Sequence, residues 1–131
     1  MTDEITLTIP RERAFHRIAH LVLGGVAVRQ NLTLEHLEDL QLAVDGLLEQ
    51  RQAPDDVTVE LHVRDDAIEA WVGPFERGRL RAELDRDPQD GSVGLSRLLA
   101  TVVDDAELVE RRGRDWIRLV KDVGGSAEVG D

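Results

Sequence analysis

A strict alternation of apolar and polar residues in the middle of the chain places the strongest constraint on its fold. Residues 57–63 read VTVELHV, in which every second residue is valine or leucine. A period of two predicts a strand that buries one face and leaves the other polar. Residues 64–66 (RDD) indicate a turn, and residues 67–72 return the chain as the second strand of a hairpin. The chain is therefore expected to form a sheet with one buried face, which another layer must cover.

Hydrophobic periodicity predicts the remaining elements in the same way. Strands are expected at residues 5–9, 106–111 and 115–121, and amphipathic helices at residues 11–29, 33–50 and 94–103. Thr33 is expected to cap the second helix, and residues 112–114, which include Gly113, to form a tight turn between the last two strands. Residues 73–91 are rich in charge, proline and glycine, and are interpreted as a mobile loop with at most one short helix. This order predicts an α/β (α+β) two-layer sandwich, a mixed five-stranded sheet with about three helices on one face.

Composition limits the classes of protein to which the chain can belong. Its 131 residues include 16 basic and 27 acidic side chains, for a formal charge of −11, and no cysteine. One domain is expected over residues 1–123, with a disordered tail at residues 124–131. The absence of cysteine excludes disulfides and thiolate metal sites, and the acidity argues against binding nucleic acid or an anionic membrane. No apolar stretch approaches the ~20 residues of a membrane span, so we expect a cytoplasmic protein.

Three short strings, in this order, carry a family resemblance. Residues 39–44 read DLQLAV, residues 91–95 read GSVGL and residues 116–121 read WIRLVK, with Asp104 ahead of the last predicted hairpin. Over roughly residues 5–123 the pattern resembles the anti-sigma-factor serine-protein kinases of bacterial partner-switching systems, in the histidine-kinase-like ATPase (GHKL) superfamily. The resemblance implies the Bergerat fold, a homodimer, a sigma factor and/or an anti-sigma antagonist as partners, and ATP with magnesium as possible cofactors.

The chain departs from this family at the positions that carry its chemistry. The resemblance implies a glutamate general base on the second helix and a magnesium-binding asparagine four residues later, on the same helical face. Gly46 and Gln50 occupy these two positions, and Gly73 stands where an aspartate would hold the adenine. Asp45 and Glu49 are adjacent, but one residue along a helix turns a side chain by ~100°. We therefore assign no catalytic residue and no metal ligand, and the chain is interpreted as a divergent member with degenerate ATP-binding motifs.

The glycine-rich string is the remaining element that could face a phosphate. Backbone amides at the start of a helix can hold phosphate, which makes Gly91, Gly94 and Leu95 candidate cofactor-binding residues together with Gln50 and Gly73. A turn that leads into a helix explains the same glycines without any ligand. The sequence leaves both interpretations open.

Other residues with possible chemistry receive a structural interpretation. Glu12, His16 and His20 recur at helical spacing and are interpreted as boundary residues of an amphipathic helix rather than metal ligands. Trp71 and Trp116 fall on predicted strands and are interpreted as core residues rather than a binding platform.

Two functions remain from this reasoning. The first is an anti-sigma-like regulator that binds a sigma factor and/or an antagonist without effective ATP hydrolysis or kinase activity. Its acidic surface suits the basic, DNA-facing parts of a sigma factor. The alternative is an active ATP-dependent serine/threonine kinase that phosphorylates an antagonist. Leu21 and Val28 lie opposite the core stripe of the first helix, and are the expected dimer contact.

Overall fold

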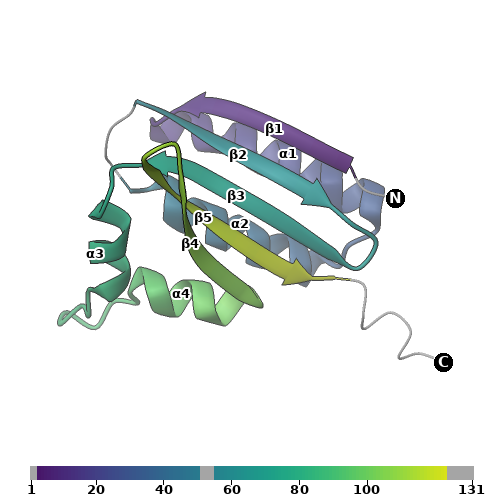
Figure 1. Cartoon of the computed structure of the whole chain (residues 1–131). Helices are drawn as coiled ribbons and strands as arrows, with labels where there is room; N and C mark the ends of the chain where they lie inside the picture. Colours follow the sequence, from purple (N-terminus) through teal and green to yellow (C-terminus); the bar gives the residue numbers. More distant parts are fainter. Residues whose placement is uncertain (1–2, 51–54, 124–131) are drawn as a thin grey trace.

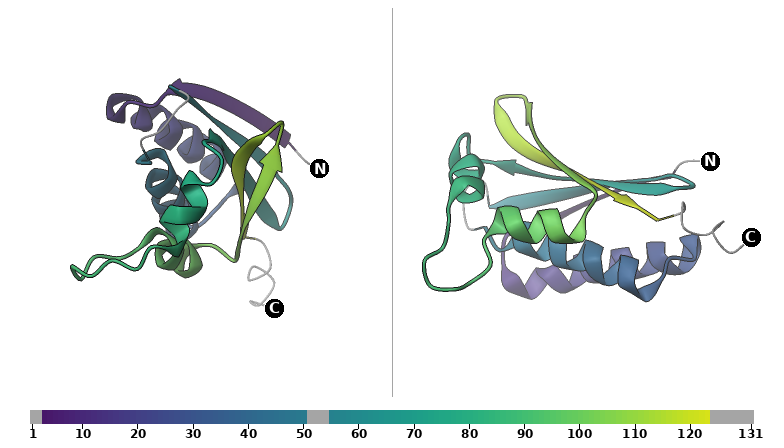
Figure 2. Two further views of the ribbon diagram at one scale, coloured as in Figure 1. Left: turned by 60° about the vertical axis from the view of Figure 1, so that its left-hand side comes forward. Right: turned by 90° about the horizontal axis from the view of Figure 1, so that it is seen from below.

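A sheet and a layer of helices pack face to face, with the helices on one side of the sheet only (Figures 1 and 2). The computed structural model describes residues 3–50 and 55–123. In chain order the elements are β1 (Asp3–Pro10), the 3-10 turn η1 (Arg13–Phe15), α1 (His16–Gln30), α2 (Leu34–Leu48), β2 (Asp56–Val63), β3 (Ala67–Phe75), α3 (Arg79–Asp85), α4 (Leu95–Val102), β4 (Asp105–Arg111) and β5 (Arg114–Asp122). The expected two-layer α+β fold is confirmed.

The five strands lie in the order β1-β2-β3-β5-β4, and each neighbouring pair is antiparallel. The expectation of a mixed sheet is therefore wrong. Between β1 and β2 the chain runs through two antiparallel helices, which return it to the end of the sheet where β1 finished. The next strand must then run back along β1, whereas a single crossover helix would have made the pair parallel.

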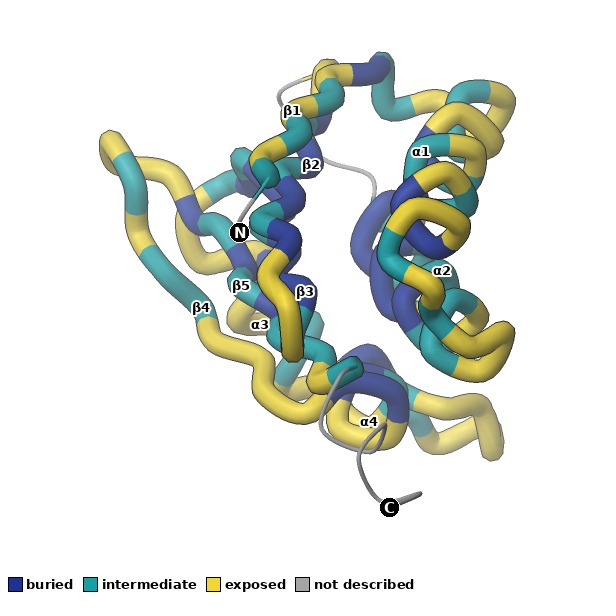
Figure 3. The backbone as a smooth tube through the Cα atoms, turned by 90° about the vertical axis from the view of Figure 1, so that its right-hand side faces the viewer, coloured by how far each residue is buried: buried dark blue, intermediate teal, exposed yellow. Residues whose placement is uncertain are grey.

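The core lies between the sheet and the helical layer, where buried residues of both layers face one another (Figure 3). The predicted alternation in β2 is confirmed, because its four aliphatic residues are 0–3% exposed and face the helices. In β3 the residues Ile68, Ala70 and Val72 do the same at 0% exposure. Burial of each large aliphatic side chain contributes about 1.5–3 kcal/mol, so this pleat decides which face of the sheet the helices cover.

Local signals set the ends of the first two helices. Asn31 has a left-handed backbone (φ 58°) and ends α1, a conformation that asparagine tolerates better than most residues. The predicted cap at Thr33 is confirmed, since its hydroxyl accepts a hydrogen bond from the His36 N–H at 3.0 Å. Such a cap is worth about 1 kcal/mol.

A lysine near the end of β5 joins the two layers. The Lys121 ammonium donates to Asp39 on α2 at 2.9 Å and to the Val102 carbonyl at the end of α4 at 3.0 Å. Its side chain is 13% exposed, so the pair is only partly screened by water. Residues from the first and last strings of the family resemblance thus meet in space.

The end of β3 differs from the sequence expectation. The strand continues to Phe75, through a register shift between Val72 and Phe75, rather than ending at residue 72. Residues 73–91, expected to hold at most one short helix, contain α3, whose Leu80 is fully buried. The tail predicted as disordered, residues 124–131, lies outside the described residues.

Candidate functional site

Gly46, at the position where the resemblance implies a general base, faces α4 at close range. A Cβ atom on Gly46 would lie 2.9 Å from Leu98 Cδ2 and 3.3 Å from Leu95 Cδ1. Two leucine side chains thus fill the space that a longer residue at position 46 would enter. The arrangement is apolar and has no group that could accept a proton.

The two acidic neighbours on α2 point elsewhere. An Asp45 oxygen lies 2.7 Å from His20 Nε2 on α1, and a Glu49 oxygen lies 3.8 Å from Arg13 Nη2. Both carboxylates therefore face the beginning of the chain rather than α4, as expected for an offset of one residue on a helix. The contact with Asp45 also gives His20 a structural partner, which supports its interpretation as a helix-boundary residue.

The side-chain amide of Gln50 forms a hydrogen bond at the C-terminal end of α2. Its Nε2 donates to the Gly46 carbonyl at 3.1 Å, which satisfies one of the carbonyl groups left open at a helix end. The backbone carbonyl of Gln50 accepts a hydrogen bond from Arg11 Nη1 at 3.4 Å. In this geometry the amide supports the end of α2 rather than an ion site.

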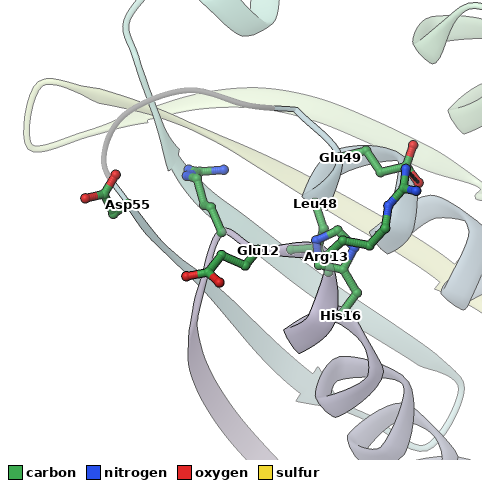
Figure 4. Close-up of a pocket in the computed structure, with 7 residues that line it drawn as sticks. Glu12, Arg13, His16, Leu48, Glu49 and Asp55 are labelled. Atoms are coloured by element: carbon green, nitrogen blue, oxygen red, sulfur yellow. Dashed lines mark ion pairs between the residues drawn. The ribbon is translucent and has the colours of Figure 1, made fainter.

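Beside this helix end lies a cavity of about 550 Å³ (Figure 4). Its lining carries charges of both signs and consists of Arg11, Glu12, Arg13, His16, Leu48, Glu49 and Asp55. The Arg11 guanidinium lies 4.9 Å from the Phe75 ring centroid, and its burial lowers its pKa. The described residues hold no group of three histidine or carboxylate side chains that could bind a metal.

Gly73 does not face the helices. A Cβ atom there would lie 2.5–2.9 Å from three carbons of the Trp116 indole, which covers the opposite face of the sheet. The side chains that point from this end of β3 towards the helices are Val72 and Phe75, both fully buried. The adenine-side carboxylate is thus absent from the helix-facing positions as well as from residue 73.

A carboxylate that sequence reasoning missed lies on the neighbouring strand. Asp115 is 8% exposed, and its Oδ2 accepts a hydrogen bond from the Gly78 N–H at 2.9 Å. This contact ties β5 to the start of α3. The only sequence signal was an acidic residue at a predicted strand start, which is common and carries no prediction of burial.

The glycine-rich string forms the turn into α4. Gly91 has a left-handed backbone (φ 84°), and Gly94 is the N-cap residue of α4. A Cβ atom added to Gly94 would lie 3.1 Å from Pro88 Cδ. The Ser92 hydroxyl and N–H donate to Asp90 and hold the pKa of that carboxyl below its usual value. Gly91 and Gly94 line a cavity of about 420 Å³, whereas Leu95 is buried against Gly46. Of the candidate cofactor residues, Gln50 and Leu95 both contact Gly46, Gly91 and Gly94 share this cavity, and Gly73 faces the other side of the sheet.

The expectation that the two tryptophans are core residues is wrong. Trp71 and Trp116 are partly exposed and lie outside the core, on the face of the sheet that the helices leave open. The Arg111 guanidinium lies over both rings, with its Cζ atom 4.1 Å from the Trp71 centroid and 4.7 Å from the Trp116 centroid.

Comparisons with known proteins agree with this fold. No protein-family model matches the chain. The serine-protein kinase RsbW of Listeria innocua is 29% identical over 136 residues, covering 86% of this chain and 83% of that protein. The protein of the same name from Listeria monocytogenes serotype 4a is 30% identical with the same coverage.

A solved structure has a similar fold. The crystal structure of the RsbU and RsbW domains of Rv1364c from Mycobacterium tuberculosis matches with a TM-score of 0.67 and 15% identity, over 92% of this chain. This chain spans about a third of that longer one, 32%, and at this identity the match shows the fold alone. No helix among the described residues is long and apolar enough to cross a membrane. With 30% identity across most of both chains, this protein belongs to the RsbW family of anti-sigma-factor serine-protein kinases, within the GHKL superfamily.

Proposed function

We propose that this protein is an anti-sigma-type regulator that binds a sigma factor and/or an anti-sigma antagonist without effective ATP hydrolysis or kinase activity. The family supports the partner-switching role. The observation that carries the loss of catalysis is the contact of Gly46 with α4, where Leu98 and Leu95 occupy the space beside the base position.

The chemistry of phosphoryl transfer supports the proposed loss of kinase activity. The reaction depends on positioning of the phosphates and on the charge of metal ions, with a base that orients the nucleophile. Gly46 offers no base, and the Gln50 amide is engaged with the Gly46 carbonyl. Magnesium binds best through carboxylates in near-ideal octahedral geometry, and the nearest carboxylate, Asp45, is held by His20. The residues present do not fit a complex of ATP and magnesium.

The surface fits a role in protein binding. A formal charge of −11 favours association with basic partners by complementary electrostatics. On the outer face of α1, Leu21 is 69% exposed and Val28 is 84% exposed. A second copy of the chain would cover these side chains, so we propose a homodimer through α1.

Calorimetry with ATP and magnesium chloride tests the loss of nucleotide use. The expected result is no heat of binding and, in a parallel assay, no transfer of labelled γ-phosphate to proteins of the source organism. Low-micromolar binding that requires magnesium would overturn the proposal and favour the alternative, an active serine kinase, which is the activity named for the relatives.

Affinity capture from the source organism, followed by mass spectrometry, tests the regulatory role. A sigma factor or an anti-sigma antagonist should be recovered in stoichiometric amounts. Recovery of neither class would contradict the regulatory role while leaving the nucleotide result unaffected.

A further inference from the structure

The open face of the sheet holds an arginine that contacts both tryptophans. The Arg111 guanidinium lies over the rings of Trp71 and Trp116, with its Cζ atom 4.1 and 4.7 Å from their centroids. Its Nη1 and Nη2 donate to the Glu60 carboxylate at 3.0 and 3.4 Å. Each cation–π contact is worth about 0.5–2 kcal/mol, so the two indoles are held in place by a group from a neighbouring strand.

The turn beside this cluster adds two further arginines. β4 and β5 are joined by Arg112 and Gly113, whose backbones are both left-handed (φ 52° and 79°), as a tight two-residue hairpin requires. Asparagine or glycine would suit such a position better than arginine, so the turn geometry does not account for Arg112. Within residues 3–50 and 55–123, neither Arg112 nor Arg114 forms an ion pair.

These groups converge on one cavity. It measures about 750 Å³, within the range of ligand sites, and is lined by Glu60, Pro74, Arg111, Arg112, Arg114 and Trp116. Because Glu60 already neutralises Arg111, the unpaired charge in the lining is that of the other two guanidinium groups. A cavity with two uncompensated positive charges and an indole wall is unusual on a chain with a net charge of −11.

The charges in and around the cavity limit which ligands can bind there. Guanidinium groups bind carboxylates with paired hydrogen bonds, and the part of the Trp116 indole that lines the cavity offers apolar surface to a side chain. A long polyanion such as nucleic acid would have to run past the exposed Glu107 and Glu110 on β4, against the overall negative charge. A short segment with a few carboxylates around one apolar residue does not have to run past these two glutamates.

We propose that this cavity is a docking site for an acidic peptide segment of a partner protein. Carboxylates of the segment pair with Arg112 and Arg114, and its apolar residue packs on Trp116, while Arg111 and Glu60 keep the indoles in position. The site is on the face opposite α2 and α4, so it operates whether or not the chain uses nucleotide.

Intrinsic fluorescence tests the site directly. Trp116 in the lining and Trp71 beside Arg111 are the only tryptophans in the chain, which has no tyrosine, so the emission reports the cavity and its immediate surroundings. Titration with an acetylated EELEE peptide should give a saturable change in emission that weakens as salt is raised. The uncharged peptide QQLQQ and the basic peptide KKLKK should give none.

Paired variants assign the effect to the two free arginines. Arg112→Asn with Arg114→Gln should weaken EELEE binding by about tenfold or more, because both guanidinium groups are removed. Asparagine tolerates the left-handed backbone of residue 112, so this variant should fold, as circular dichroism can verify. Arg17→Gln with Arg97→Gln removes the same charge from exposed positions on α1 and α4, and should leave binding unchanged.

Three outcomes would overturn the proposal. They are no saturable response to EELEE at millimolar concentration by fluorescence and by calorimetry, equal weakening in the two double variants, or tighter binding of a single-stranded oligonucleotide than of the peptide.

Discussion

A Cβ atom on Gly46 would lie 2.9 Å from Leu98 Cδ2, so that the helix carrying the family's catalytic positions packs directly against α4. The contact is apolar and leaves no room for a carboxylate without movement of the leucine. It gives a physical reason for a glycine at residue 46, where the resemblance implies the base, since α2 and α4 approach one another there.

Gly46→Glu should lower the free energy of unfolding by about 1–3 kcal/mol, because the new carboxylate displaces Leu98 and loses contact with water. Urea unfolding followed by circular dichroism measures the change. Gly46→Ala is the control: its methyl group meets only the flexible ends of Leu98 and Leu95, and alanine gains about 1 kcal/mol of helix propensity, so the two effects nearly cancel. Equal stability of the two variants would show that the space is open.

The double variant Gly46→Glu with Gln50→Asn should not acquire magnesium-dependent binding of ATP. It restores two side chains of the family pattern, but Val72 and Phe75 still face the helices where a carboxylate for adenine is needed. Calorimetry with ATP and magnesium chloride measures this. Low-micromolar affinity in the double variant would mean that two residues alone account for the lost function.

Leu21→Glu should convert the proposed dimer into a monomer without unfolding it, because a charge replaces a 69% exposed leucine on the outer face of α1. Light scattering measures the mass and circular dichroism the fold. Val93→Glu, at 65% exposure in the turn before α4, adds the same charge elsewhere and should leave the mass unchanged. An unaltered mass for Leu21→Glu, or loss of its fold, would contradict the proposal.

A buried carboxylate on the open face makes stability depend on pH. Glu69 is 7% exposed, accepts a hydrogen bond from Arg118 and lies 3.5 Å from Arg64 Nη2. Burial alone would raise the pKa of Glu69, but hydrogen bonds from Trp71 and Arg118 and the charges of both arginines outweigh it, so the pKa is lowered. The stabilisation is therefore present above the ordinary value of 4.5, and is lost as pH falls through the lower value of the folded state.

Glu69→Gln should accordingly destabilise the fold by about 1–3 kcal/mol at pH 7, with a difference that shrinks as the pH drops below the ordinary glutamate value. Urea unfolding at several pH values measures it. Glu107→Gln serves as a control, since that side chain is 60% exposed and 3.5 Å from the same arginine, and should cost less than about 1 kcal/mol. A difference for Glu69→Gln that stays constant down to pH 3 would contradict the assignment.

Local patterns were sufficient for much of the fold. The alternation in residues 57–63, the cap at Thr33 and the turn near Gly113 each depend on neighbours in the chain, and each is confirmed. The mixed sheet was predicted wrongly because strand direction depends on how two helices return the chain, which periodicity does not encode.

The candidate site also combines features that follow from the sequence with features that only the structure shows. The sequence by itself determined that residue 46 is not a base and residue 50 is not an asparagine, because these are matters of side-chain identity. Only the tertiary structure decided that Gly73 faces Trp116 and that Asp39 meets Lys121, 82 positions away. A shift of one residue in a strand turns the side chains that follow to the other face. Gly73 keeps the register of β3 with β2, whereas the irregularity between Val72 and Phe75, set by non-local pairing with β5, turns Phe75 towards the helices.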